Sequence, residues 1–120
     1  MTLTTRLLIT VTMATIALAQ QRYESTYDDL DVGTILGNSD LRESYYACFM
    51  DTAPCPTDAA VFFKSKAPEA FVASCKYCTD KQLIMFEKII SWYVNNSPDQ
   101  WNSLVEKTIQ DAKSQGLQFR

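Results

Sequence analysis

The stretch CFMDTAPC at residues 48–55, together with CKYC at residues 75–78, decides the fold of this chain. The four cysteines follow the spacing C-x6-C-x19-C-x2-C. In a small domain outside the cell, four cysteines indicate two disulfides, for which three pairings are possible. Prolines flank the second cysteine and force a turn that can bring it back to the first. We therefore favour the two local pairs, Cys48–Cys55 and Cys75–Cys78.

Two other uses of these cysteines stay open at this point. Four thiolates can bind one zinc ion tetrahedrally, but thiols oxidise outside the cell. The C-x-x-C pair at residues 75–78 also has the spacing of a redox motif. That motif lies between a strand and a helix, whereas both flanks here have helical patterns. We therefore expect structural disulfides and no bound metal.

Residues 1–19 have the composition of a secretory signal peptide. Arg6 provides a basic start, residues 7–18 form a mostly apolar run, and small residues stand one and three positions before Gln20. The alternative is an uncleaved membrane anchor, but the run is shorter than the about 20 residues that a bilayer core requires. We expect cleavage before Gln20, one secreted domain at residues 20–120, and no stable membrane insertion.

The composition argues against catalysis and against nucleic-acid binding. The chain has 120 residues, a formal net charge of −3 and no histidine. It therefore lacks the usual general base, the His-activated Ser and Cys nucleophiles and imidazole zinc ligands, although carboxylate or lysine chemistry stays open. Its basic residues are scattered among acidic ones. We expect neither an enzyme nor a nucleic-acid-binding protein, and no cofactor.

Helical periodicity begins after a polar N-terminal segment. Asp31 is placed to cap a short helix at residues 32–36, which Gly37 can end in a left-handed conformation. A second helix begins at one of the polar residues 38–40, and its apolar positions follow an i, i+4, i+7, i+8 pattern. These positions are Leu41, Tyr45, Cys48 and Phe49.

Two short helices are expected between the cysteine pairs. Thr57 or Asp58 is placed to cap a helix at residues 59–65. Pro68 favours the first turn of another helix, at residues 69–74. This pattern predicts a break in the chain just before Pro68.

The last two expected helices are longer. Thr79 and Gln82 have the spacing of a capping box for a helix that runs to about Val94. Its apolar face is wide, which indicates a central helix contacted from several sides. The serine before Pro98 is placed to cap the last helix, and Gly116 to end it. The sequence predicts an all-α fold, a compact bundle of about six short helices.

These residues together resemble the insect chemosensory protein family. The similarity covers nearly all of the mature chain up to about Glu106. The matching segments are YDDLDV at residues 27–32, IL at 35–36, LxxxY at 41–45, CFMDTAPC at 48–55, CxxCTDKQ at 75–82 and PDxWxxL at 98–104.

The resemblance implies about six helices around an apolar channel with both disulfides local. It also implies carriage of fatty-chain alcohols, esters, acids or similar semiochemicals through aqueous lymph. One departure concerns the channel: the family continues after the Trp101 helix with an aromatic-rich segment, whereas this sequence stops at Arg120. We therefore expect one wall of the channel to differ.

A carrier needs a concave apolar pocket with a few polar groups. The resemblance places Tyr45 at a position that lines and gates the channel, where its phenol could hydrogen-bond a ligand head group. Gln82 could offer a second polar contact, although its capping role competes. Each apolar candidate also fits ordinary core packing. The candidate wall residues are Leu36, Leu41, Tyr45, Phe49, Phe62, Gln82, Phe86, Ile89, Ile90, Tyr93, Trp101 and Leu104.

The function we expect is a secreted, extracellular carrier of small hydrophobic molecules, monomeric, with a receptor as a conceivable further partner. The alternative is a secreted signalling or structural protein that acts through its surface in development or defence. Asn95 begins a glycosylation sequon whose occupancy the sequence leaves open, because Pro98 follows it. The ligand, the tissue and an olfactory role are not specified by the sequence.

Overall fold

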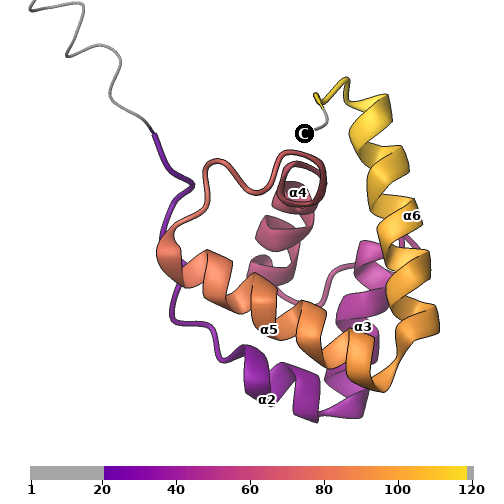
Figure 1. The fold of residues 1–120 in the computed structure, drawn as a ribbon. Coiled ribbons are helices and arrows are strands. Elements are labelled where there is room, and N and C mark those ends of the chain that lie inside the picture. Colours follow the sequence, from indigo (N-terminus) through magenta and orange to yellow (C-terminus); the bar gives the residue numbers. More distant parts are fainter. Residues whose placement is uncertain (1–20, 119–120) are drawn as a thin grey trace, which may run out of the picture.

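The computed structural model describes residues 21–118, and within them the chain forms five α-helices and no strand (Figure 1). The helices are α2 (Val32–Gly37), α3 (Ser39–Phe49), α4 (Asp58–Val72), α5 (Asp80–Asn96) and α6 (Pro98–Ser114). The predicted all-α fold class is confirmed, with five helices where about six were expected. None of these helices is long and apolar enough to cross a bilayer. The predicted signal peptide at residues 1–19 lies outside the described residues.

Polar side chains set the starts of α2 and α3. The carboxylate of Asp31 accepts a hydrogen bond from the N–H of Thr34 at 3.1 Å, as its predicted capping role requires. Of the three candidates before α3, Asn38 is the cap, and its side-chain oxygen accepts from the N–H of Leu41 at 3.1 Å. Gly37 is the last residue of α2 and has no positive φ, so its predicted left-handed role is wrong. The extended Asn38 turns the chain directly into α3 instead.

The two helices predicted at residues 59–65 and 69–74 are one continuous helix, α4, with Pro68 inside it. Proline removes a backbone donor and crowds the preceding turn, which costs a helix interior about 3 kcal/mol or more. Pro68 is buried here, as are Phe62 and Val72 on the same helix, and α4 packs along α6. Burial of a continuous face outweighs the local cost, because tertiary packing provides most of a helix's stability.

The start of α5 is fixed by the predicted capping box. The Thr79 side chain accepts from the N–H of Gln82 at 3.2 Å, and the Gln82 side chain accepts from the N–H of Thr79 at 3.0 Å. The helix continues past the predicted end near Val94 to Asn96. The backbone N–H groups of Thr79 and Gln82 at the start of α5 therefore both have hydrogen-bond partners.

Pro98 starts α6 and Ser97 is its N-cap residue, both as predicted. The hydroxyl of Ser97 pairs with the side chain of Gln100, however, and makes no hydrogen bond to a backbone N–H. At the other end Gly116 adopts φ 72° and donates its N–H to the carbonyl of Lys113 at 3.1 Å. The predicted glycine termination of α6 is confirmed.

The helices pack around a shared interior. Figure 1 shows α5 crossing the molecule with α2 beneath it, while α4 and α6 rise on the other side. Contacts join α2 to α5, α5 to α6 and α4 to α6. Buried Val32, Leu36, Met85 and Tyr93 form one core cluster between α2 and α5. Every helix therefore turns at least one face toward the same interior.

Both predicted disulfides are present. Cys48 pairs with Cys55 and Cys75 with Cys78, with Cα atoms 4.7 Å and 5.3 Å apart. The first closes the turn after α3, and the second closes the turn between α4 and α5. The four-thiolate zinc alternative is therefore excluded. The C-x-x-C pair lies between two helices and not after a strand, which also separates it from the redox motif.

Candidate ligand-binding site

A cavity of about 140 Å³ lies between the helices. All five described helices contribute to its wall, together with Tyr23 and Leu30 from the segment before α2. Protein cores seldom contain voids much larger than one water molecule. Apolar cavities of about 150 Å³ stay dry and accept apolar molecules. The fold therefore encloses a space suited to an apolar ligand.

The structure brings ten of the twelve predicted wall residues to this cavity. Leu41 and Ile90 do not reach it, although both are half-buried. The ten are Leu36, Tyr45, Phe49, Phe62, Gln82, Phe86, Ile89, Tyr93, Trp101 and Leu104.

The stripe of α3 that faces the cavity shares Tyr45 and Phe49 with the predicted one but does not include Leu41. It begins at Arg42 and continues through Tyr45, Tyr46 and Phe49, which follow an i, i+3, i+4, i+7 pattern. Leu41 lies one residue, or about 100°, away from that stripe. Because the first position of this stripe is an arginine, a pattern of apolar residues alone does not identify it.

Helix α5 places four of its five predicted wall residues at the cavity. Its cavity face consists of Gln82, Met85, Phe86, Ile89 and Tyr93, which are i, i+3, i+4, i+7 and i+11. Ile90 is one residue off this face. Because α5 is apolar on most sides, hydrophobicity alone does not show which side faces the cavity.

Aromatic rings form much of the cavity wall. Phe71 contacts Phe86 and Trp101, with ring centroids 5.4 Å apart in both pairs. Tyr93 stacks on Trp101 at 6.2 Å and contacts Tyr46 at 6.3 Å. These rings come from α3, α4, α5 and α6, so they join four helices into one apolar lining. Tyr46 and Phe71 were not among the predicted wall residues.

Tyr45 lines the cavity, but its hydroxyl already has a partner. It lies 2.8 Å from the hydroxyl of Thr57, in an exposed position. Thr57 in turn caps α4 by accepting from the N–H of Ala60 at 3.1 Å. Tyr45 therefore links α3 to the start of α4. A phenol in one such bond keeps capacity for a second one.

Gln82 is buried, with 4% of its surface exposed, and its polar atoms are fully used by the protein. Its amide nitrogen donates to the carbonyl of Glu24 at 3.0 Å and to the carboxylate of Asp28 at 2.9 Å. Its amide oxygen accepts from the N–H of Thr79. An amide nitrogen has two donors, and both are occupied. Gln82 therefore anchors the N-terminal segment to α5.

Tyr93 is the most buried tyrosine of the wall, with 5% of its surface exposed. Burial, with a smaller contribution from the charge of Glu43, raises the pKa of Tyr93 to about 12. The phenol is therefore neutral at physiological pH. Hydrogen bonds make no contribution to this shift.

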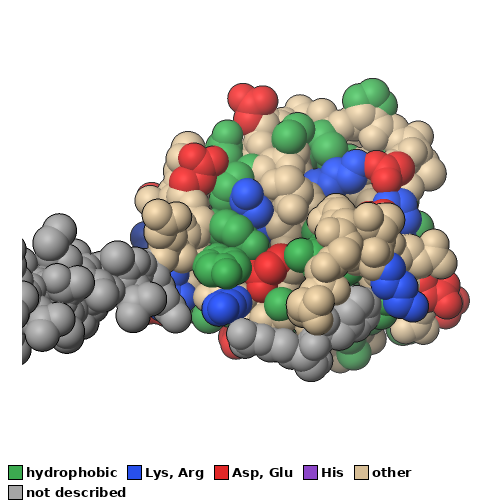
Figure 2. All heavy atoms as spheres, turned by 90° about the horizontal axis from the view of Figure 1, so that it is seen from above, with side chains coloured by type: hydrophobic (Ala, Val, Ile, Leu, Met, Phe, Trp, Pro, Cys, Tyr) green, Lys and Arg blue, Asp and Glu red, His purple; other side chains and the backbone are tan. Residues whose placement is uncertain are grey.

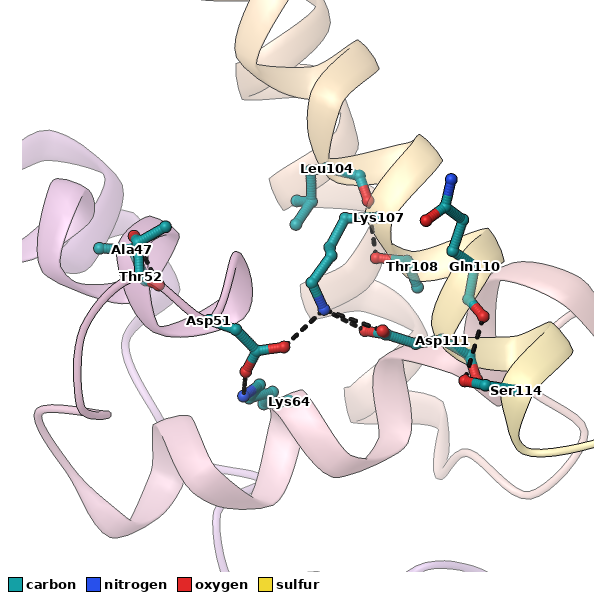
Figure 3. A network of polar contacts seen from close by, with 10 residues as sticks. All are labelled: Ala47, Asp51, Thr52, Lys64, Leu104, Lys107, Thr108, Gln110, Asp111 and Ser114. Carbon is teal, nitrogen blue, oxygen red and sulfur yellow. Dashed lines mark hydrogen bonds and ion pairs between the residues drawn. The ribbon is translucent and has the colours of Figure 1, made fainter.

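A network of charges holds the first disulfide loop against α4 and α6. Figure 3 shows Lys107 of α6 reaching between Asp51 and Asp111, at 2.6 Å and 2.7 Å. Lys64 of α4 contacts Asp51 from the other side. Hydrogen bonds from both lysines lower the pKa of Asp51 to about 2, from an ordinary value of 3.8. Asp51 thus joins the loop to two helices that carry cavity residues.

This network should make stability depend on pH in the acid range. The depressed pKa of Asp51 means that its contribution is complete above about pH 3.8 and is lost as the pH falls to 2. Asp51→Asn should lower the melting temperature at pH 7, and the difference from wild type should disappear toward pH 2. Asparagine tolerates the left-handed φ of 61° at this position, so the backbone is preserved. Circular dichroism melts from pH 7 to 2 test this, and a difference that persists at pH 2 contradicts it.

The surface of the described part carries mixed charges and no metal-binding cluster. On the face seen in Figure 2, acidic and basic side chains are interspersed, with apolar side chains exposed among them. No group of three or more His, Cys, Asp or Glu residues in the described part could hold a metal ion. The sequon residue Asn95 is exposed at the end of α5 and donates its amide to the carbonyl of Ser91 at 2.8 Å. The cavity is therefore the candidate site.

A family model described as the insect pheromone-binding family, A10/OS-D, matches residues 23–115. The chain belongs to this insect pheromone-binding family. Ejaculatory bulb-specific protein 3 of Drosophila melanogaster is 32% identical over 89 residues, which are 74% of this chain and 70% of that protein. The family resemblance drawn from the cysteine motifs is confirmed.

Solved structures of chemosensory proteins have the same fold. One, a chemosensory protein in complex with bromo-dodecanol, matches with a TM-score of 0.70 and 24% identity, over 79% of this chain and 94% of that one. Another, the antennal chemosensory protein A6 from the moth Mamestra brassicae, has a TM-score of 0.60 and 24% identity, over 82% of this chain and 99% of that one. In this member of the A10/OS-D family, the described residues of the cavity wall lie between Tyr23 and Leu104.

Proposed function

We propose that this protein is a secreted carrier that holds small hydrophobic molecules, such as fatty-chain semiochemicals or lipids, in its internal cavity. One observation carries the proposal: an apolar cavity of about 140 Å³ is lined by every described helix. A core built for stability alone would close such a space, because each unfilled volume costs packing energy. The solved relative in complex with bromo-dodecanol supports the same class of ligand.

Burial of the ligand's alkyl chain would supply the binding affinity. Removing about a dozen CH₂ groups from water contributes about 10 kcal/mol at about 0.8 kcal/mol each. Micromolar binding requires about 8 kcal/mol, and part of the gross gain is lost to immobilising the ligand. A neutral head-group hydrogen bond adds only about 1 kcal/mol. We therefore propose that the apolar wall sets affinity, and that polar groups such as the Tyr45 hydroxyl adjust selectivity.

Export and a non-catalytic role complete the proposal. Two disulfides are typical of proteins that fold in an oxidising compartment, which supports secretion after removal of residues 1–19. The chain has no histidine, and its cysteines within residues 21–118 are all paired. We propose a monomeric carrier that binds without catalysis, cofactor or nucleic acid.

Wild-type protein should take up N-phenyl-1-naphthylamine with micromolar affinity and release it when 1-dodecanol is added. This affinity corresponds to a net binding free energy of about 8 kcal/mol, which burial of the ligand's apolar surface would supply. Fluorescence titration measures both steps, and native mass spectrometry should show one dodecanol per monomer. A protein that acts only through its surface would bind neither compound, which would overturn the carrier proposal.

A further inference from the structure

The cavity-facing stripe of α3 starts with a charged residue. Arg42 lines the apolar cavity with Tyr45, Tyr46 and Phe49, and only 18% of its side-chain surface is exposed. A cation placed beside an apolar space loses hydration, so it is unfavourable without a compensating partner. The position therefore calls for an explanation that core packing does not give.

The protein satisfies this guanidinium only in part. One terminal nitrogen donates to the carbonyl of Leu36 at 2.7 Å, and the guanidinium carbon lies 4.3 Å from the centre of the Trp92 ring. The Nε atom is buried and has no hydrogen-bond partner, the one such side-chain atom within residues 21–118. The nearest carboxylate, that of Glu43, is 3.9 Å from Nε, which is too long for a hydrogen bond. A guanidinium has five donors, so several remain available.

The charges around the cavity all have one sign. Arg42 and Lys66 line it, and no aspartate or glutamate among the described residues does. Lys66 lies over the rings of Tyr23 and Phe62, at 4.8 Å and 5.2 Å from their centres. Glu43 is half-exposed, and its other oxygen accepts from the side chain of Gln100 at 3.0 Å, so solvent and a neutral donor share its charge. The two charged side chains that border the cavity are therefore both cationic, and their field favours an anion over a cation.

We propose that Arg42 is the specificity-determining residue for the ligand's head group, and that the cavity prefers long-chain carboxylates to alcohols of the same length. This inference rests on the proposed carrier function. The planar guanidinium fork matches a carboxylate with two parallel hydrogen bonds, whereas an alcohol accepts through one oxygen. A ligand carboxylate would also place a negative charge within hydrogen-bonding distance of Arg42, which the Glu43 carboxylate does not. Arg42 is thus a binding residue for the head group, while the aromatic wall holds the chain.

The test compares dodecanoate, 1-dodecanol and dodecane at pH 7.5 by displacement of N-phenyl-1-naphthylamine. Wild type should bind dodecanoate about tenfold more tightly than 1-dodecanol, the ratio expected for a charge-assisted pair over a neutral hydrogen bond. Arg42→Met keeps the aliphatic stem and should bring this ratio to about one. Circular dichroism should show the helix content of wild type, so that a lost ratio cannot come from unfolding.

Two further variants separate Arg42 from its neighbours. Glu43→Gln removes the competing carboxylate and should tighten dodecanoate binding about threefold, with 1-dodecanol unchanged. Lys66→Met should lower the dodecanoate preference much less than Arg42→Met does, because the Lys66 ammonium lies over the rings of Tyr23 and Phe62. A preference that survives Arg42→Met, or is lost only in Lys66→Met, overturns the assignment to Arg42. Tight binding of 1-dodecanol and dodecane without any dodecanoate preference in wild type overturns the head-group inference alone, whereas failure of all three ligands overturns the carrier proposal as well.

Discussion

Ile89→Asp should lower the affinity for long apolar ligands at least about a hundredfold. Ile89 lies on the cavity face of α5, at the middle of its wall. A carboxylate there must remain hydrated or become protonated, and either state costs about 3 kcal/mol or more when an alkyl chain displaces the water. Each 1.4 kcal/mol corresponds to about a tenfold change in affinity. The loss should be equal for 1-dodecanol and dodecane, because it concerns the chain and not the head group.

Ile84→Asp is the matched control for this experiment. Ile84 is on the same helix, is 52% exposed and does not line the cavity, so the same substitution should leave binding within about twofold of wild type. Circular dichroism must show equal helix content in both variants. If folded Ile89→Asp binds dodecane as tightly as Ile84→Asp does, the ligand is held elsewhere and the cavity is not the site.

Local rules were enough to predict most helix termini. The Thr79 and Gln82 capping box, the Asp31 cap and the Gly116 termination depend on contacts within four residues of each other. Both disulfides also join near neighbours in the sequence. These helix termini and disulfides can be predicted from the sequence because the residues that determine them are close together in the chain.

The errors arise where a distant contact decides the outcome. Pro68 would end α4 by its local preference, yet α4 continues because its buried face packs along α6. On α3 and α5 the predicted wall also included Leu41 and Ile90, which lie one residue off the cavity face, because both helices are apolar on more than one side. Periodicity gives the width of an apolar face, but only the positions of neighbouring helices select which part of it borders the cavity. Arg42 was missed for a related reason, since a charged residue was not sought in an apolar wall.

Tyr93→Ala should destabilise the protein by about 3–5 kcal/mol, the usual cost of removing a buried aromatic ring. Tyr93 is buried, and its ring contacts Tyr46, Trp92 and Trp101, so it joins α3, α5 and α6. A domain of this size typically has only about 5–15 kcal/mol of stability. The melting temperature should therefore fall by about 15 °C or more.

Tyr93→Phe is the control, because it keeps the ring and removes only the hydroxyl. No hydrogen bond contributes to the raised pKa of Tyr93. The free energy of unfolding of Tyr93→Phe should therefore stay within about 1 kcal/mol of wild type. Thermal melts followed by circular dichroism compare the two variants, and urea titration gives the free energies. If Tyr93→Ala melts within a few degrees of Tyr93→Phe, the aromatic wall does not hold the helices together. The two disulfides and the Asp51 network would then have to maintain the cavity, and Asp51→Asn should reduce ligand binding as well as stability.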